Sequence, residues 1–199
     1  MIPVLPATYL GNTAYFSQLA KHKVVHVLRD ETYQKQTFRN RAVILSANGP
    51  LSLSIPVVRP FGKKTKTAEV TFSLAENWKL NHWKTLKSAY NRSPYFEFYE
   101  DSFKSVFFEA YENLFEFNTA LTNYLIGKIG ITCQLKPIEN NGANIPLTLD
   151  FSPKVEIIFK PYPYLQTFTE KYGFVPNLSI LDLLFNEGPN TICILEESY

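Results

Sequence analysis

The sequence predicts an α/β protein with a mixed β-sheet that is opened by a βαβ unit and a β-hairpin and flanked by helices. The first observation lies in residues 1–30: a short apolar segment, a helical pattern over 13–22, and a β-branched run over 23–30. A strand, a helix and a strand in such a short stretch are typical of a parallel sheet. The second observation is Asn48-Gly49 between two strand-like runs, which predicts a tight hairpin. The third is a set of amphipathic helical patterns in the second half of the chain.

The individual elements follow from local signals. The first strand is expected to end near Tyr9 and the first helix to be capped by Asn12 or Thr13. The hairpin is followed by the basic segment "RPFGKKTK" (59–66), expected to be an exposed loop, and by a strand over 67–73. Asn77 is expected to cap a helix that ends before Pro94.

The second half of the chain is expected to be mainly helical. Apolar residues at three- and four-residue steps from Phe103 to Leu125 predict one long helix or two, ending near Gly130. A short strand is predicted over 132–136, a loop over 137–154 and another strand from Val155. The last predicted helix is capped by Asn177 or Ser179 and ends at Gly188-Pro189.

Composition restricts the class of protein. A chain of 199 residues with 45% apolar and 19% charged residues is expected to form a single folded domain over 1–199. A net charge of +2 is too weak to indicate nucleic-acid or membrane binding by bulk attraction. No segment has the length of a membrane span, and the N-terminus lacks the pattern of a signal peptide, so we expect a cytoplasmic protein. The aromatic content of 15% is explained either by an aromatic core or by a ring-lined cleft that suits sugars.

The most informative segment is "YQKQTFRNR", residues 33–41, because it concentrates three cations just before an apolar run. If it forms a strand, Lys35, Arg39 and Arg41 share one face with Tyr33 and Thr37. Like charges repel, so an anion is expected opposite them. That anion could be an internal carboxylate such as Asp30 or Glu31, or a bound phosphate or carboxylate. A solvated positive face is the remaining alternative.

A few residues are candidates for chemistry. His82, in an aromatic-rich helix, suits a general acid or base, although a hydrogen-bonded structural histidine is the simpler interpretation. His22 and His26 are four residues apart, but a helix end and a strand start are expected between them, so no metal site is predicted. Asp182 stands between apolar residues and needs polar partners, which favours a structural anchor. The sequence contains no G-x-S-x-G or G-x-G-x-x-G motif, and Cys133 and Cys193 have no metal or redox spacing.

Several phrases together resemble the WbqC-like family of bacteria. They are "YLGNTAYF" (9–16), "YQKQTFRNR" (33–41), "LSIPV" (53–57), "HWKTLKSAYNRSPYFEFYED" (82–101) and "FVPNLSILDLLFNEGP" (174–189). The start of the chain departs from the family pattern, since "LPATYLGNTAYF" lacks a glutamine often found there and has Gly11 and Ala14 in place of a proline and a glycine. The polar positions that match the family are Tyr9, Lys35, Arg39, Asn40, Arg41, His82, Tyr90, Asn177 and Asp182.

The resemblance implies a role in surface-polysaccharide assembly, for O-antigen or capsule, including transfer of glycine or another amino acid to a sugar. On that basis the first hypothesis is a transferase acting on a nucleotide-linked or lipid-linked sugar. In it, Lys35, Arg39 and Arg41 hold phosphate, His82 is the general base, and Tyr9 and Tyr90 line the sugar site. The second is a non-catalytic protein that binds a glycan or a partner of the same pathway. The third makes residues 33–41 an internal salt-bridge hub with Asp30 and Asp182. The cofactor, the donor and the oligomeric state remain open.

Overall fold

The computed structural model describes residues 2–140, 145–151 and 159–198. Its first unit is a parallel sheet in the order β1 (Val4–Leu5), β2 (Val24–Leu28) and β7 (Gln134–Ile138). The helix α1 (Thr13–Lys21) connects β1 to β2, so the predicted βαβ unit is confirmed. Asn12 caps α1 by accepting a hydrogen bond from the backbone N–H of Tyr15. The first strand ends at Leu5, earlier than the sequence predicts.

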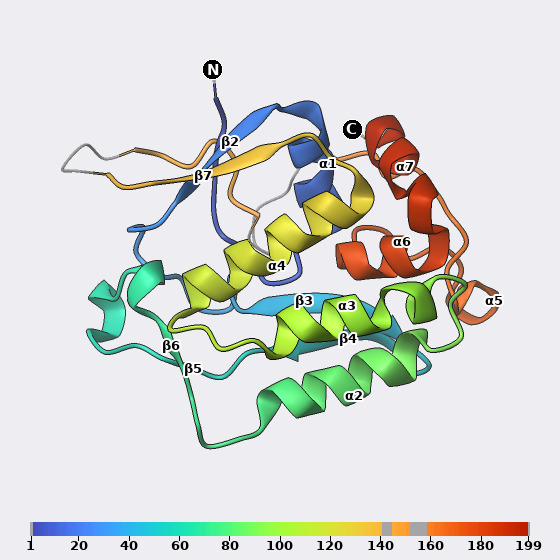
Figure 1. Cartoon of the computed structure of the whole chain (residues 1–199), viewed down its shortest axis with the longest axis horizontal. Coiled ribbons are helices and arrows are strands. Elements are labelled where there is room, and N and C mark those ends of the chain that lie inside the picture. The colour runs from blue at the N-terminus through green and yellow to red at the C-terminus, as the bar shows by residue number, and fades with distance from the viewer. Residues whose placement is uncertain (1, 141–144, 152–158, 199) are drawn as a thin grey trace.

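The predicted hairpin is also present. Strands β3 (Arg41–Ser46) and β4 (Gly49–Ser54) pair antiparallel around a turn at Ala47-Asn48, one residue earlier than the predicted Asn48-Gly49. Gly49, which takes φ +101°, is already the first residue of β4 and pairs with Ser46. The hairpin forms a sheet of its own and does not extend the parallel sheet. The α/β class is therefore confirmed, with its strands divided among small sheets. In Figure 1 the parallel sheet lies at the top of the view, the hairpin in the middle and α2 at the bottom.

A short irregular region follows the hairpin. Strand β5 (Val57–Val58) pairs with β6 (Thr71–Phe72), and two 3₁₀ turns, η1 (Gly62–Lys64) and η2 (Thr67–Glu69), lie between them. The prediction of a strand over 67–73 is therefore wrong for the first half of this range. There the Glu69 side chain closes a turn by accepting a hydrogen bond from the backbone N–H of Lys66. The loop before it is exposed, as predicted.

The central helices carry most of the apolar packing. They are α2 (Trp78–Tyr90), capped by Asn77 as predicted, α3 (Phe96–Phe108) and α4 (Leu114–Ile129). The long apolar pattern therefore forms two helices, because the Asn113 side chain caps a new helix by accepting from the N–H of Glu116. Gly130 ends α4 in the left-handed conformation at φ +84°.

The C-terminal part packs helices against this core. The short α5 (Thr169–Tyr172) is followed by α6 (Ile180–Glu187), which Ser179 caps and Gly188 ends, as predicted. The turn η3 (Gly188–Asn190) leads into α7 (Thr191–Glu197), a helix that the sequence analysis did not anticipate. Most of the strand predicted from Val155 lies outside the described residues.

One cluster of buried side chains runs from Leu5 in β1 to Leu195 in α7. Its centre is aromatic, with Phe107 and Phe117 fully buried and their ring centroids 5.7 Å apart. Many of the aromatic residues therefore serve packing, as in the simpler of the two explanations of the high aromatic content. Within the described part of the chain, no helix combines the length and the apolar composition needed to cross a membrane.

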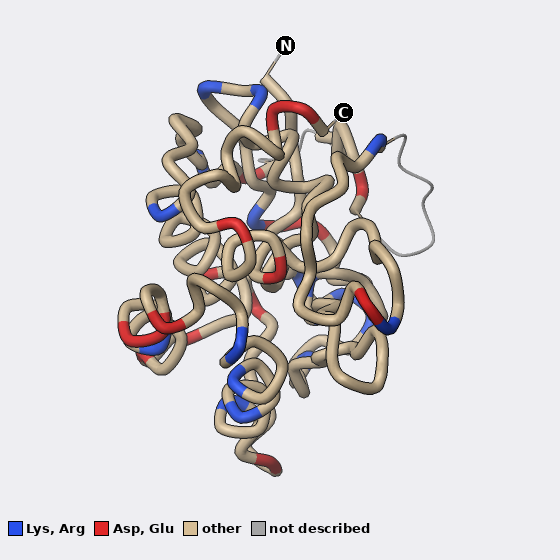
Figure 2. Tube along the Cα trace, turned by 90° about the vertical axis from the view of Figure 1, so that its right-hand side faces the viewer, with Lys and Arg blue, Asp and Glu red and all other residues tan. Residues whose placement is uncertain are grey.

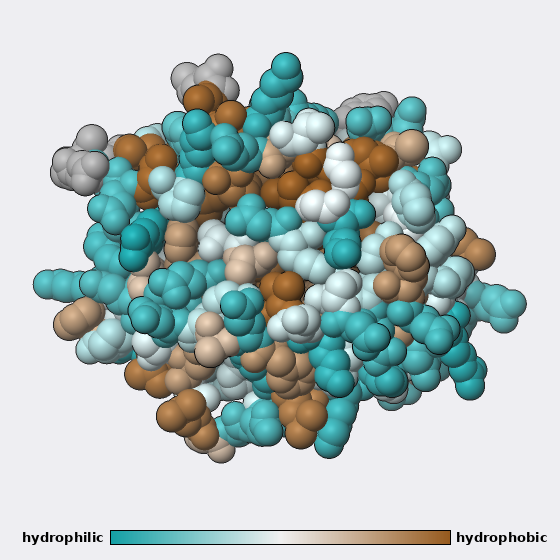
Figure 3. Space-filling model, in the orientation of Figure 1, coloured by the Kyte–Doolittle hydropathy of each residue, from teal (hydrophilic) through white to brown (hydrophobic). Residues whose placement is uncertain are grey.

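The surface has no dominant charge. Both Lys or Arg and Asp or Glu residues are spread over the whole trace in Figure 2. The face shown in Figure 3 is mostly hydrophilic, with apolar residues in separate small patches. Any ionic ligand must therefore be recognised by a local group of side chains, because the overall charge of +2 is weak.

Candidate functional site

The segment 33–41 does not form the strand that the sequence predicts. Strand β3 begins only at Arg41, and the residues before it form turns, with Gln36 in the left-handed region at φ +59°. Alternation with a period of two therefore does not apply, and the three cations do not share one face. The structure instead sends Arg39 into the interior and leaves Lys35 exposed.

Arg39 is an internal ion-pair centre. Its side chain is 1% exposed, and Nε and Nη2 donate to the two carboxylate oxygens of Glu31 at 2.7 and 2.6 Å. Its Nη1 lies 3.5 Å from Oδ1 of Asp150. Burial alone would lower the pKa of the guanidinium, but the bonds and charge of Glu31 raise it. The internal carboxylate expected opposite the cations is thus confirmed for Glu31, and Arg39 is not free to hold phosphate.

The other cations of the segment line a cavity of about 390 Å³, which we call the cationic pocket. Lys35 and Arg41 come from the segment, and Arg59 follows β5. Ile55, Pro56 and Val57 add apolar groups to the lining. The complete lining is Tyr33, Lys35, Gln36, Asn40, Arg41, Ile55, Pro56, Val57 and Arg59.

The cationic pocket contains polar groups that the protein does not satisfy. Nε of Arg41 and Oδ1 of Asn40 are buried and have no hydrogen-bond partner, although Nδ2 of Asn40 donates to the carbonyl of Ile55. Among the described residues, Lys35, Arg41 and Arg59 form no ion pair. A buried donor without an acceptor is costly, so this arrangement is suited to a ligand that brings an anion.

Tyr33 adds a neutral donor to the pocket wall. Burial raises the pKa of its hydroxyl to about 12, against the opposing effect of Arg59, Arg39 and Arg41. The hydroxyl therefore stays protonated at neutral pH and can donate a hydrogen bond to a ligand oxygen.

His82 lies in the interior beside Tyr9. The Tyr9 hydroxyl is 2.9 Å from Nδ1 of His82, and Tyr9 is fully buried while His82 is 8% exposed. Burial lowers the pKa of His82 to about 4, although a hydrogen bond with the backbone of Ser54 raises it. The imidazole is therefore neutral at neutral pH. His82 lines none of the cavities described here, but Ser54 directly precedes Ile55 of the cationic pocket.

The remaining predicted site residues lie elsewhere and form structural contacts. Oδ2 of Asp182 accepts from the hydroxyl of Tyr164 and from Nε2 of Gln166, at 2.8 and 2.9 Å. Burial raises the pKa of Asp182, and its hydrogen-bonding neighbours, among them Tyr90, oppose this. The side chain of Asn177, at φ +57°, accepts from the backbone N–H of Ala14 in α1.

These contacts test the hypothesis that residues 33–41 form an internal salt-bridge hub with Asp30 and Asp182. Asp182 pairs with tyrosine and amide groups, and Asp30 accepts from the backbone N–H of Asn140. Neither belongs to the ion pairs of Arg39. The hub predicted with Asp30 and Asp182 is therefore wrong. Among the described residues Arg39 is the cation of the segment that forms ion pairs, and its carboxylates are Glu31 and Asp150.

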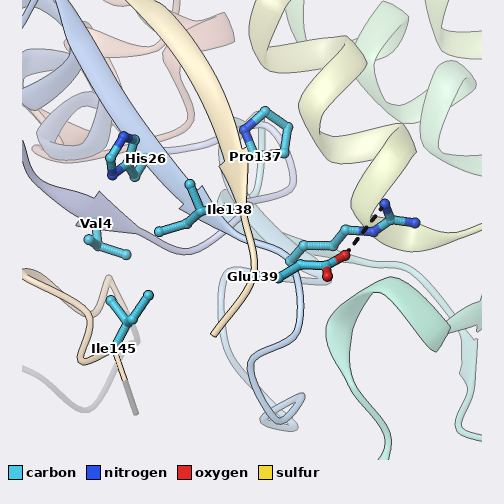
Figure 4. A pocket seen from close by; sticks show the side chains of 7 residues that line it. Val4, His26, Pro137, Ile138, Glu139 and Ile145 are labelled. Atoms are coloured by element: carbon cyan, nitrogen blue, oxygen red, sulfur yellow. Dashed lines mark ion pairs between the residues drawn. The ribbon is translucent and has the colours of Figure 1, made fainter. Parts of the chain in front are cut away.

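A larger cavity, of about 630 Å³, lies against the parallel sheet (Figure 4). His26 and Ile138 line it from β2 and β7, and Val4 lines it from β1. Its cation, Arg29, is 3.9 Å from Glu139 and thus already paired.

Sequence reasoning missed Arg59 as a pocket residue. The signal was its place in the basic segment 59–66, for which a phosphate-binding role was considered but an exposed loop was preferred, because the segment has too few glycines for a P-loop. Within the described ranges, no group of three or more His, Cys, Asp or Glu side chains is arranged to hold a metal ion. The predicted break between His22 and His26 is present, since α1 ends at Lys21 and β2 starts at Val24.

Comparison with known proteins gives two findings. The model of the WbqC-like protein family matches residues 7–144. An uncharacterized protein of Mycobacterium tuberculosis, Rv1507c, is 24% identical over 217 aligned positions, which cover 94% of each chain. No solved structure gives a significant match.

Proposed function

Because the chain belongs to the WbqC-like protein family, we propose that it binds a phosphorylated sugar of bacterial surface-polysaccharide biosynthesis in the cationic pocket. The observation that carries the proposal is that Lys35, Arg41 and Arg59 line one cavity and form no ion pair with any residue that the structure describes. A phosphate supplies several strong acceptors and suits the planar fork of arginine.

The pocket offers complementary groups for both parts of such a ligand. Arg41, Arg59 and Lys35 would surround the phosphate, and the neutral hydroxyl of Tyr33 would donate to one of its oxygens. The free Oδ1 of Asn40 would accept from a sugar hydroxyl. The cavity of about 390 Å³ is in the range typical of small-molecule sites.

A second candidate function is transfer of glycine or another amino-acid or acyl group to that sugar. The Tyr9–His82 pair favours it, because His82 contacts the backbone of Ser54, next to the pocket residue Ile55. His82 would then act as general base on an attacking amine or hydroxyl. A histidine with a pKa of about 4 is a weak base at neutral pH, so binding without catalysis is better supported.

The test is a thermal-shift titration with sugar phosphates and nucleotide sugars. A ligand at about 100 times its dissociation constant stabilises the folded state by roughly 2.7 kcal/mol. We expect stabilisation of the wild type that is lost in Arg41→Ala and in Arg59→Ala. Arg92→Ala is the matched control, because Arg92 is exposed and lines a different cavity.

The two candidate functions diverge in the His82→Asn variant. A binding protein keeps its ligand affinity in this variant and shows no turnover in either form. A transferase forms a sugar conjugate in the wild type and loses the rate in the variant. Failure of every phosphorylated ligand to stabilise the wild type would contradict both.

A further inference from the structure

The loop beside the cationic pocket combines positive charge with exposed apolar side chains. Residues 59–66, which we call the basic loop, contain four Lys or Arg and no acidic residue. Phe61 is 63% exposed at its tip, and Val58, just before the loop, is 48% exposed. Lys63 and Lys64, two and three residues after Phe61, are exposed. The feature that sets this stretch apart is the combination of two exposed apolar side chains, Val58 and Phe61, with charges of one sign only.

The loop is held in a defined shape by one buried threonine. Oγ1 of Thr65 accepts from the N–H of Phe61 at 2.9 Å and donates to the carbonyl of Gly62 at 3.1 Å. Gly62 takes φ +58°, which lets the chain turn tightly behind Phe61. Thr65 itself is fully buried. The phenyl ring is therefore presented outward by local hydrogen bonds.

The basic loop and the cationic pocket form one unit. Arg59 begins the loop and lines the pocket. The N–H of Tyr33, another lining residue, donates to the carbonyl of Thr65 at 2.9 Å. Thr32 and Lys66 form a bridge next to this bond. A surface that binds the basic loop would therefore lie close to the cationic pocket.

An anionic membrane surface matches this unit best. Clustered Lys and Arg residues are attracted to acidic headgroups, and an aromatic side chain gains by entering the boundary with the acyl chains. The acid nearest in sequence, Glu69, is engaged with the backbone N–H of Lys66. Nucleic acid would use the charges but would leave Val58 without a role. We infer that the basic loop docks on an anionic membrane surface, with Phe61 inserted among the lipids.

This docking specifies the ligand class of the pocket. A pocket held at the headgroup level would take a sugar phosphate that is carried on a lipid, with its phosphate between Arg41 and Arg59. This second part rests on the proposed function. The docking itself does not, because it depends on Phe61 and the exposed lysines, which do not line the pocket.

The test is sedimentation with vesicles of phosphatidylcholine alone, or of phosphatidylcholine and phosphatidylglycerol in equal parts. We expect binding to the mixed vesicles only. Phe61→Ser and the double variant Lys63→Ala/Lys64→Ala should each weaken that binding by roughly tenfold or more. High salt should weaken the binding of the wild type.

Matched controls exclude a general effect of surface changes. Phe98→Ser removes a phenylalanine that is 76% exposed on α3, and Lys23→Ala/Lys84→Ala removes two exposed lysines elsewhere. These variants should bind like the wild type, and all variants should keep the unfolding temperature. Equal binding by loop and control variants, or no binding to mixed vesicles, would overturn the docking. Tighter binding of the protein to a short oligonucleotide than to the mixed vesicles would also overturn the proposed membrane docking.

The two proposals fail separately. Arg41→Ala should still sediment with mixed vesicles but lose stabilisation by a soluble sugar phosphate. Phe61→Ser should keep that stabilisation and lose sedimentation. Loss of vesicle binding in Arg41→Ala alone, with Phe61→Ser unaffected, would assign the contact to the pocket and not to the loop.

Discussion

Arg39 and Arg41 stand two positions apart in the chain and occupy opposite environments. Arg39 is enclosed by Glu31 and Asp150, whereas Arg41 starts β3 with a buried Nε that no protein atom satisfies. The backbone between them passes from turns to strand, so the two side chains diverge. The comparison teaches that two arginines of one charged segment can have different roles. Arg39 stabilises the fold, and Arg41 is available to a ligand.

Removing the enclosed arginine should have the largest effect. In Arg39→Met, Glu31 keeps a buried charge without its partner, and breaking a buried pair costs about 3–5 kcal/mol. Urea unfolding should show this loss. The double variant Arg39→Met/Glu31→Met should recover much of it, because the uncompensated charge is gone. A loss below about 1 kcal/mol in the single variant would remove the structural half of the comparison.

The free energy of unfolding should also decrease in acid because His82 is buried. The pKa of His82 is about 4 in the folded state and about 6.5 when unfolded, so the unfolded state binds the proton more readily. Stability from this group is complete above about pH 6.5 and is lost as the pH falls towards about 4, by on the order of 3 kcal/mol.

The check is the free energy of unfolding measured across this pH range. His82→Gln should flatten the acid-side slope relative to the wild type, whatever its own stability. His22→Gln, at the end of α1, is the control that should keep the slope. An unchanged slope in His82→Gln would mean that the pKa of His82 is the same in the folded and unfolded states, which would restore His82 as a base that can take up a proton near neutral pH.

The two carboxylates around Arg39 should differ from each other. Glu31 makes two short bonds and is nearly buried, whereas Asp150 makes one contact at 3.5 Å with a side chain that is 26% exposed. Glu31→Gln is expected to cost about 2 kcal/mol, and Asp150→Asn less than about 1 kcal/mol. Thermal unfolding of the two variants measures the difference. A larger loss in Asp150→Asn would show that the ion pair depends on the outer carboxylate.

Sequence patterns predicted well what depends on local interactions. The Asn12, Asn77 and Ser179 caps, the hairpin of β3 and β4 and the βαβ unit follow from neighbouring residues, and all are present. The resemblance of the phrases to the WbqC-like family agreed with the family match over 7–144.

What failed depends on tertiary partners. Residues 33–40 have the composition of a polar strand, but Glu31 and the distant Asp150 draw Arg39 inward, and the segment turns. Nothing local indicated that Arg59 would join Arg41, since that requires the path of β5 beside the hairpin. The catalytic role of His82 stays a prediction, and so do the sugar contacts of Tyr9 and Tyr90, both of which are fully buried.

Arg41→Ala is expected to have the smallest effect on stability and the greatest effect on ligand binding. Arg41→Ala removes a side chain that forms no ion pair among the described residues and leaves Nε unsatisfied, so its loss should change the free energy of unfolding by no more than about 0.5 kcal/mol. Affinity for a phosphorylated ligand should fall by roughly 10- to 100-fold, the worth of one or two charged hydrogen bonds. Calorimetric titration and urea unfolding of the same variant give both values. If Arg41→Ala instead lost as much stability as Arg39→Met, both arginines would be structural. The unpaired cations of the cationic pocket would then no longer indicate a ligand.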